Sequence, residues 1–72
     1  MKPFEDANEA AQFVERFEGK ASELKLAISD SLLDPLGINM AIITDKILDK
    51  DWEPNGFEEN EGYRVYMYKE ME

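Results

Sequence analysis

The chain of 72 residues contains neither cysteine nor histidine. Without these residue types, one chain cannot form the usual zinc sites, ligate haem through histidine, or pair a serine or cysteine nucleophile with a histidine base. The absence of disulfides also agrees with a reducing compartment. These absences exclude several catalytic chemistries, and we expect a protein that is not an enzyme.

Long apolar runs are missing as well. No segment approaches the roughly 20 apolar residues that a membrane-spanning helix requires. Residues 1–20 contain no continuous apolar run of the signal-peptide type. We therefore expect a cytoplasmic protein without membrane contact, folded as one small domain over residues 1–72.

Basic residues are scarce. Eight Lys and Arg stand against 17 Asp and Glu, which gives a formal net charge of −9. Such a surface repels phosphate backbones and attracts basic proteins. We expect a basic protein partner rather than direct contact with nucleic acid, although solubility alone is the simpler explanation of the charge.

Metal and cofactor motifs are incomplete or absent. Asp51, Glu53 and Asn55 match the first three ligand positions of a calcium-binding EF-hand loop, but Gly62 stands where a bidentate glutamate is required. The four glycines are isolated at positions that turns require, so there is no glycine-rich phosphate loop. The sequence predicts no metal, no cofactor and no catalytic residue.

The first regular element is an amphipathic helix over about residues 5–18. At about 100° per residue its small and aromatic apolar side chains share one arc, and polar residues lie opposite. Asp6 and Glu9 have the spacing of a capping box, which predicts the start of the helix. Gly19 is suited to end it in a left-handed conformation.

The next segment, Lys20 to Asp34, fits two structures. As a helix, it places Leu24, Ala27 and Ile28 on one face; as a strand, it places Leu24, Leu26 and Ile28 on one side. The length of the periodic segment and the scarcity of β-branched residues favour a helix over about 22–33, with the strand as the alternative.

The most hydrophobic segment is Gly37 to Lys50, which we predict as a third helix over about 37–50. Met40, Ile43, Ile47 and Leu48 share one arc, and Ile38 and Ile42 lie on another. A helix this apolar is expected to be covered on more than one side.

The C-terminal third predicts an antiparallel hairpin with strands at about 56–59 and 63–69. Pro54-Asn55-Gly56 is typical of a turn, and Asn60-Glu61-Gly62 fits a three-residue loop with Gly62 left-handed. Alternation along the second strand puts Tyr63, Val65 and Met67 on one face, which we expect to meet the third helix.

The predicted fold is therefore α+β, a three-helix unit followed by a β-hairpin, which is winged-helix-like in outline. DNA-binding winged helices need cations on the recognition helix, yet residues 37–51 carry two lysines against three aspartates. The favoured function is a non-catalytic protein-binding or regulatory module that engages a basic partner. The alternative is a winged-helix-like transcription accessory that reaches nucleic acid only as a dimer or with a basic partner.

Two groups of residues form the candidate partner surface. Tyrosine and arginine are enriched in interfaces, and alternation puts Arg64, Tyr66 and Tyr68 on one face of the last strand. Ile38 and Ile42 are the apolar excess of the third helix. We also expect a homodimer, in which the open final strand pairs with its copy.

Overall fold

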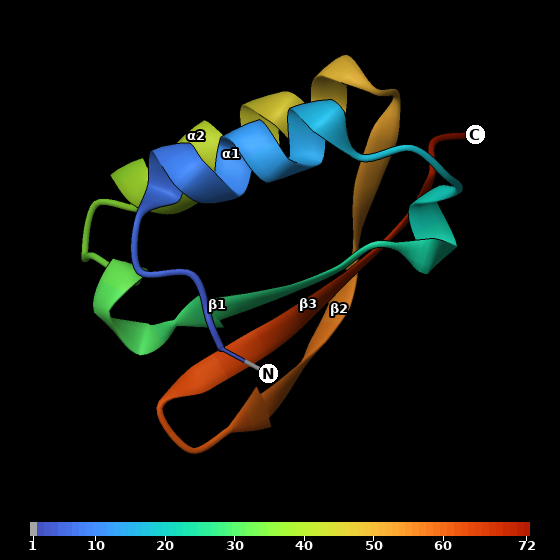
Figure 1. The fold of residues 1–72 in the computed structure, drawn as a ribbon. Coiled ribbons are helices and arrows are strands. Elements are labelled where there is room, and N and C mark those ends of the chain that lie inside the picture. Colours follow the sequence, from blue (N-terminus) through green and yellow to red (C-terminus); the bar gives the residue numbers. More distant parts are fainter. Residues whose placement is uncertain (1) are drawn as a thin grey trace.

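Two helices lie together on one face of a three-stranded antiparallel sheet in the computed structural model, which describes residues 2–72 (Figure 1). The elements follow the order α1 (Ala7–Arg16), β1 (Lys25–Ser29), α2 (Ile38–Asp49), β2 (Trp52–Asn60) and β3 (Tyr63–Glu70). The predicted α+β class is confirmed. The predicted three-helix unit is wrong, because residues 2–72 form two α-helices and three strands. The winged-helix-like outline depended on that unit and is therefore wrong as well.

The segment predicted as the second helix is the strand β1. Short 3₁₀ turns, Ala21–Glu23 and Asp30–Leu32, precede and follow it. Lys25–Ser29 pairs along its length with β3, so the strand alternative is correct, and Leu24, Leu26 and Ile28 are almost completely buried. Helix propensities differ by less than about 1 kcal/mol per residue, and pairing with a neighbouring strand overrides them.

The strand order in the sheet is β1-β3-β2, which makes the last strand the central one. Both edges of β3 are occupied by antiparallel partners, so the predicted pairing of an open final strand with its copy is wrong. The outer edge of β1 carries one further bridge, because the Phe4 N–H donates to the Ala27 carbonyl oxygen at 2.8 Å.

The hairpin is longer than predicted. Pro54-Asn55-Gly56 is not a turn but a bulge within β2, where the register shifts between Pro54 and Phe57 and Gly56 has φ +82°. The reversal takes place at Glu61–Gly62, since Asn60 already pairs with Tyr63. Gly62 has φ +86°, as its predicted left-handed conformation requires.

The helix starts depend on aspartate side chains. The Asp6 carboxylate accepts hydrogen bonds from the N–H groups of Asn8 (2.8 Å) and Glu9 (3.3 Å), which confirms Asp6 as the cap of α1. The helix ends at Arg16, so Gly19 lies in the loop beyond it. At α2 the capping residue is Gly37, which has no side chain, and Asp34 supplies the acceptors instead.

The core fills the space between the helix layer and the sheet. Its members are Ala7, Ala10, Val14, Ala21, Leu24, Leu26, Ile28, Leu32, Ile43, Ile47, Trp52 and Tyr68. The tyrosine in this set shows that the helices cover the Tyr66 and Tyr68 side of β3. The prediction that Tyr63, Val65 and Met67 meet α2 is therefore wrong, because those three side chains point away from the helices.

The helix α2 packs against α1 and against β2, and one arc of its surface stays exposed. Ile43 and Ile47 are fully buried, but Ile38 is 55% exposed and Leu48 is 43% exposed. The expectation that this helix is covered on more than one side is confirmed for its contacts with α1 and β2, and the arc that carries Ile38 and Leu48 remains open. Among the described residues, neither helix combines the length and the apolar content needed to cross a bilayer.

Candidate functional site

The residues predicted to form a partner surface are divided between two layers. Ile38 and Ile42 belong to α2, and Ile42 is partly buried against the core. Tyr68 is 4% exposed and belongs to the core itself. Arg64 and Tyr66 on β3 are joined by a hydrogen bond, and both are partly exposed.

A hairpin cluster, which we define as Phe57, Glu59, Arg64 and Tyr66, forms where β2 and β3 pair. Phe57 is opposite Tyr66 and Glu59 is opposite Arg64, so the four side chains share one face of the sheet. Cross-strand neighbours of this kind are close enough to interact directly. The local register of the hairpin therefore creates the cluster.

Arg64 connects the other three members of the hairpin cluster. Its guanidinium carbon lies 4.5 Å from the centroid of the Phe57 ring. It donates a hydrogen bond to the Tyr66 hydroxyl at 3.4 Å and pairs with the Glu59 carboxylate at 3.4 Å. The hydrogen bond with Tyr66, together with the nearby carboxylates, raises the pKa of Arg64. The guanidinium therefore stays charged.

Phe57 remains exposed within this arrangement. The centroid of its ring is 5.2 Å from that of Tyr66, at an interplanar angle of 41°, yet 43% of Phe57 is accessible. A tilted aromatic pair contributes about 0.5–1.5 kcal/mol beyond its buried area, and a guanidinium over a ring face is attracted by the negative face of the ring. The exposed ring is thus held in one orientation rather than left free.

A small hollow of about 190 Å³ adjoins the cluster. It is lined by Asp30, Leu33, Glu59, Asn60 and Arg64. Sites for small organic ligands usually measure about 300–1,000 Å³, so this hollow suits a single side chain better than a free ligand. Two carboxylates against one guanidinium leave its lining with a net negative charge.

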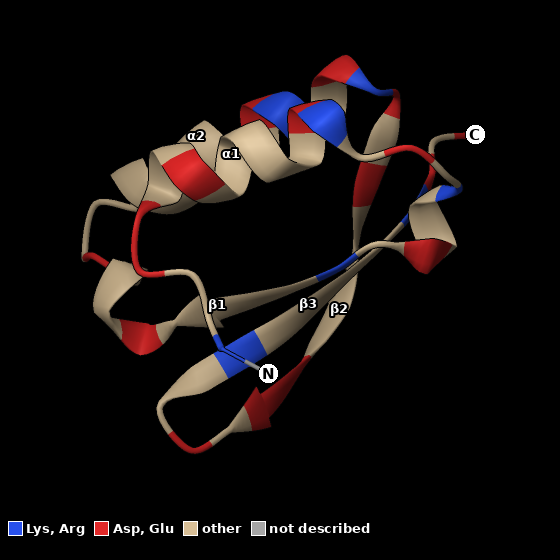
Figure 2. Ribbon diagram, viewed as in Figure 1, with Lys and Arg blue, Asp and Glu red and all other residues tan. Residues whose placement is uncertain are grey.

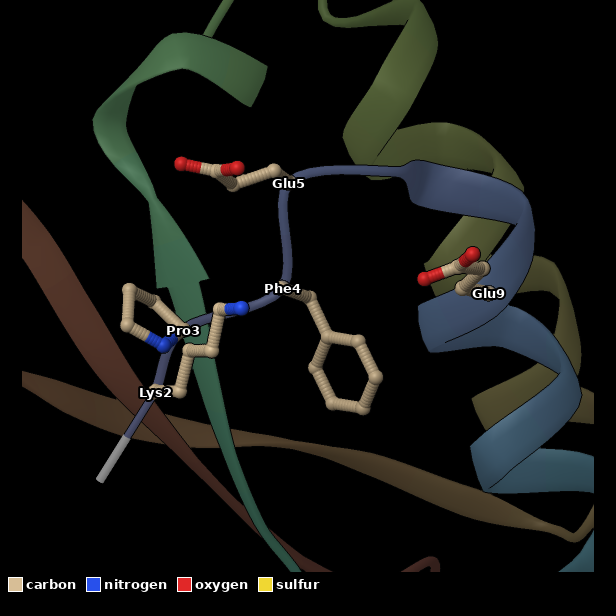
Figure 3. A pocket seen from close by; sticks show the side chains of 5 residues that line it. All are labelled: Lys2, Pro3, Phe4, Glu5 and Glu9. Atoms are coloured by element: carbon tan, nitrogen blue, oxygen red, sulfur yellow. The ribbon is translucent and has the colours of Figure 1, made fainter.

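A second hollow, of about 320 Å³, lies beside the start of α1 (Figure 3). Figure 3 shows the Phe4 ring turned toward α1, while the Glu5 carboxylate points away from that ring. Its charged groups do not converge on one point, so we assign no ligand to it. Across residues 2–72, no three acidic side chains gather closely enough to hold a metal ion.

Phe57 and Glu59 were not among the predicted surface residues. The reason is the loop length, because a three-residue loop over Asn60–Gly62 shifts every pair by one residue. A two-residue turn at Glu61–Gly62 places Phe57 opposite Tyr66 by simple counting. A correct assignment of the turn type would therefore have placed Phe57 and Glu59 beside Arg64 and Tyr66.

Comparison with protein-family models, with curated proteins and with solved structures found no match to this chain. The site is therefore interpreted from its own geometry and chemistry.

Proposed function

We propose that the chain is a non-catalytic protein-binding module that engages a basic protein partner through the hairpin cluster and the adjoining hollow. The observation that supports this most strongly is the exposed Phe57 ring, which Arg64 and Tyr66 hold in place. Aromatic residues and arginine are the types most enriched in the energetic centres of interfaces. An aromatic ring that is already oriented also loses little conformational freedom on binding.

The charge of the hairpin supports a basic partner. Residues 52–70 contain five glutamates against Arg64 and Lys69. Two of those glutamates are paired within the hairpin, to Arg64 and to Lys69, and Glu61 is exposed at the turn. A lysine or arginine of the partner would enter the hollow between Asp30 and Glu59. Long-range attraction between opposite charges would speed the encounter.

The alternative function loses its structural premise. A winged-helix-like transcription accessory requires three helices ahead of the hairpin, and residues 2–72 contain two α-helices beside a three-stranded sheet. The hairpin, with five glutamates against Arg64 and Lys69, also repels the phosphates of nucleic acid.

The test begins with capture of partners from a lysate of the source cells on the immobilised chain, followed by titration of the purified partner at low and high salt. Phe57→Ala is expected to weaken binding about thirtyfold, as for a central interface residue. The double variant Asp30→Lys/Glu61→Lys is expected to weaken binding and to reduce its dependence on salt.

The matched control is Glu18→Lys/Glu72→Lys, which changes the net charge equally at exposed positions outside the hairpin. It should bind the partner much more tightly than the hairpin double variant does. Circular dichroism checks that every variant folds. If no basic partner is captured, or if Phe57→Ala binds like the wild type, the proposal is wrong.

A further inference from the structure

The face of the sheet that points away from the helices has an apolar centre. In the described residues, both helices lie on the other side (Figure 1). The three central positions of β3 on this outer face are Tyr63, Val65 and Met67, and Ala27 lies beside Val65. The solvent-facing side of an antiparallel sheet is normally polar at such positions. Tyr63, Val65 and Met67 are partly exposed, whereas Ala27 is 4% exposed. Neighbouring apolar side chains that remain accessible on a sheet are typical of an interaction surface.

Opposite charges border this outer face at its two edges. Lys25 lies on β1, opposite Met67, and Glu58 lies on β2, opposite Val65. Glu53, also on β2, pairs with Lys69 at 3.5 Å. Among residues 2–72, neither Lys25 nor Glu58 has an ion-pair partner within the chain. Figure 2 shows the basic band on β1 and the acidic bands on β2.

We propose that this outer face binds a second copy of the chain, about a twofold axis that runs parallel to β3. Such a rotation keeps each residue at the same height along the strand and exchanges the two edges of the sheet. The β1 strand of each copy therefore lies over β2 of the other, at the spacing of about 10 Å that face-to-face sheets adopt. Val65 and Met67 pack against the same residues of the second copy.

The charges complement one another in this arrangement. Paired residues on neighbouring strands lie at the same height along the strands and form a row. Lys25 is in the row of Met67, Glu58 is in the row of Val65, and Glu53 is in the row of Lys69. Rows on one face are about 7 Å apart along a strand. Each Lys25 thus reaches between Glu53 and Glu58 of the other copy. A twofold axis in the plane of the sheet but perpendicular to β3, at the level of Val65, would instead place Glu58 over the other copy's Glu58 and Lys25 over Ser29.

The balance of charge on the outer face favours a second copy over a basic partner. The strand residues on this face include two lysines and two glutamates, Lys25, Lys69, Glu53 and Glu58. They cancel, although the chain as a whole carries −9. The net charge of the chain makes two copies repel each other, and this face adds no net charge to that repulsion. A basic partner gains no net attraction on this face.

The test measures the molar mass by sedimentation equilibrium from low to high micromolar protein. The wild type is expected to form a dimer as its concentration rises. Lys25→Glu and Glu58→Lys should each raise the dimer dissociation constant at least about tenfold, because every substitution acts twice in a symmetric interface. The double variant Lys25→Glu/Glu58→Lys should recover dimerisation, since opposite charges again face each other.

Val65→Arg places a cation at the centre of the interface in both copies and should abolish the dimer. The matched control is Lys20→Glu, which makes the same charge change in the loop before β1 and should leave the dimer intact. Phe57→Ala, on the other face of the sheet, should also leave it intact, so this test is independent of the proposed binding of a basic protein. A wild type that stays monomeric, or a folded double variant that fails to recover, would overturn the proposal.

Discussion

Three tyrosines of β3 have three different environments. Tyr63 lies on the outer face, Tyr66 joins the hairpin cluster and Tyr68 is buried in the core. Alternation groups Tyr66 with Tyr68, but it does not say how far the helix layer extends along the strand. The helices cover Tyr68 and leave the Tyr66 hydroxyl in contact with Arg64. One residue type therefore serves the core and two separate surfaces.

The buried Tyr68 makes the protein less stable as the pH rises into the alkaline range. Burial, reinforced by the neighbouring Tyr66, raises the pKa of Tyr68 above its ordinary value of 10.0. The unfolded chain releases this proton near pH 10, whereas the folded chain keeps it. The contribution to stability is therefore complete below about pH 10 and is lost as the pH rises, at about 1.4 kcal/mol per pH unit.

We expect Tyr68→Phe to remove this part of the pH dependence. Urea unfolding of the variant and the wild type at several pH values from 8 to 11 provides the measurement, with the fluorescence of Trp52 as the signal. The single tryptophan is 6% exposed and packs edge-on against Phe17, so unfolding changes its environment. Equal alkaline slopes in the two proteins would contradict the assignment.

At the scale of elements, β1 shows how a segment with helical propensity becomes a strand. Lys25–Ser29 contains leucine, alanine and lysine, which favour helices, and its only β-branched residue is Ile28. The segment pairs along its whole length with β3, and Leu26 and Ile28 fill the core. Burial of two large side chains contributes roughly 3–6 kcal/mol, which exceeds the difference in propensity.

The start of α2 gives a prediction at the same scale. Asp34 accepts hydrogen bonds from the N–H groups of Ile38 (3.1 Å) and Asn39 (3.3 Å), because the capping residue Gly37 has no side chain. We expect Asp34→Ala to lower the free energy of unfolding by about 1 kcal/mol. Asp34→Asn keeps an acceptor oxygen and should retain most of the stability.

The control for this cap is Asp45→Ala, at an exposed position in the middle of α2, which should change stability by less than about 0.5 kcal/mol. Urea unfolding measured by Trp52 fluorescence compares the three variants. If Asp34→Ala is as stable as Asp45→Ala, the capping role is wrong.

For the whole molecule, the main electrostatic effect is repulsion between like charges. The exposed ion pairs, such as Lys46 with Glu15 at 3.4 Å, contribute at most about 1 kcal/mol each. Seventeen acidic side chains against eight basic ones destabilise the compact state over its entire surface. Added salt screens both effects, and the repulsion is the larger one.

We therefore expect sodium chloride to stabilise the protein. Raising its concentration from low to physiological ionic strength should increase the midpoint of thermal unfolding by about 2–5 °C. The variant Glu18→Lys/Glu72→Lys carries less net charge and should show a smaller increase. The measurement uses dilute protein, so that dimerisation does not contribute to the midpoint of thermal unfolding. A midpoint that falls with salt would show that the ion pairs dominate.

Local patterns accounted for much of the fold. The aspartate at the N-terminus of α1, the extent of α2, the alternation of β3 and the left-handed Gly62 all follow from side chains within a few residues of each position. The candidate site was predicted in part, through Arg64 and Tyr66. Phe57 and Glu59 were missed because their place opposite those residues depends on a turn one residue shorter than expected.

The sequence by itself determined the α+β class, both helices, the final strand and the residues that share each of its faces. Only the tertiary structure decided which face of β3 points inward. Local alternation favours the uncharged face with Tyr63, Val65 and Met67, yet the face with Arg64, Tyr66 and Tyr68 meets the helices. Pairing with β1, a segment far away in the sequence, makes β3 central and directs Tyr66 and Tyr68 toward the helices. That non-local choice leaves Tyr63, Val65 and Met67 on the outer face.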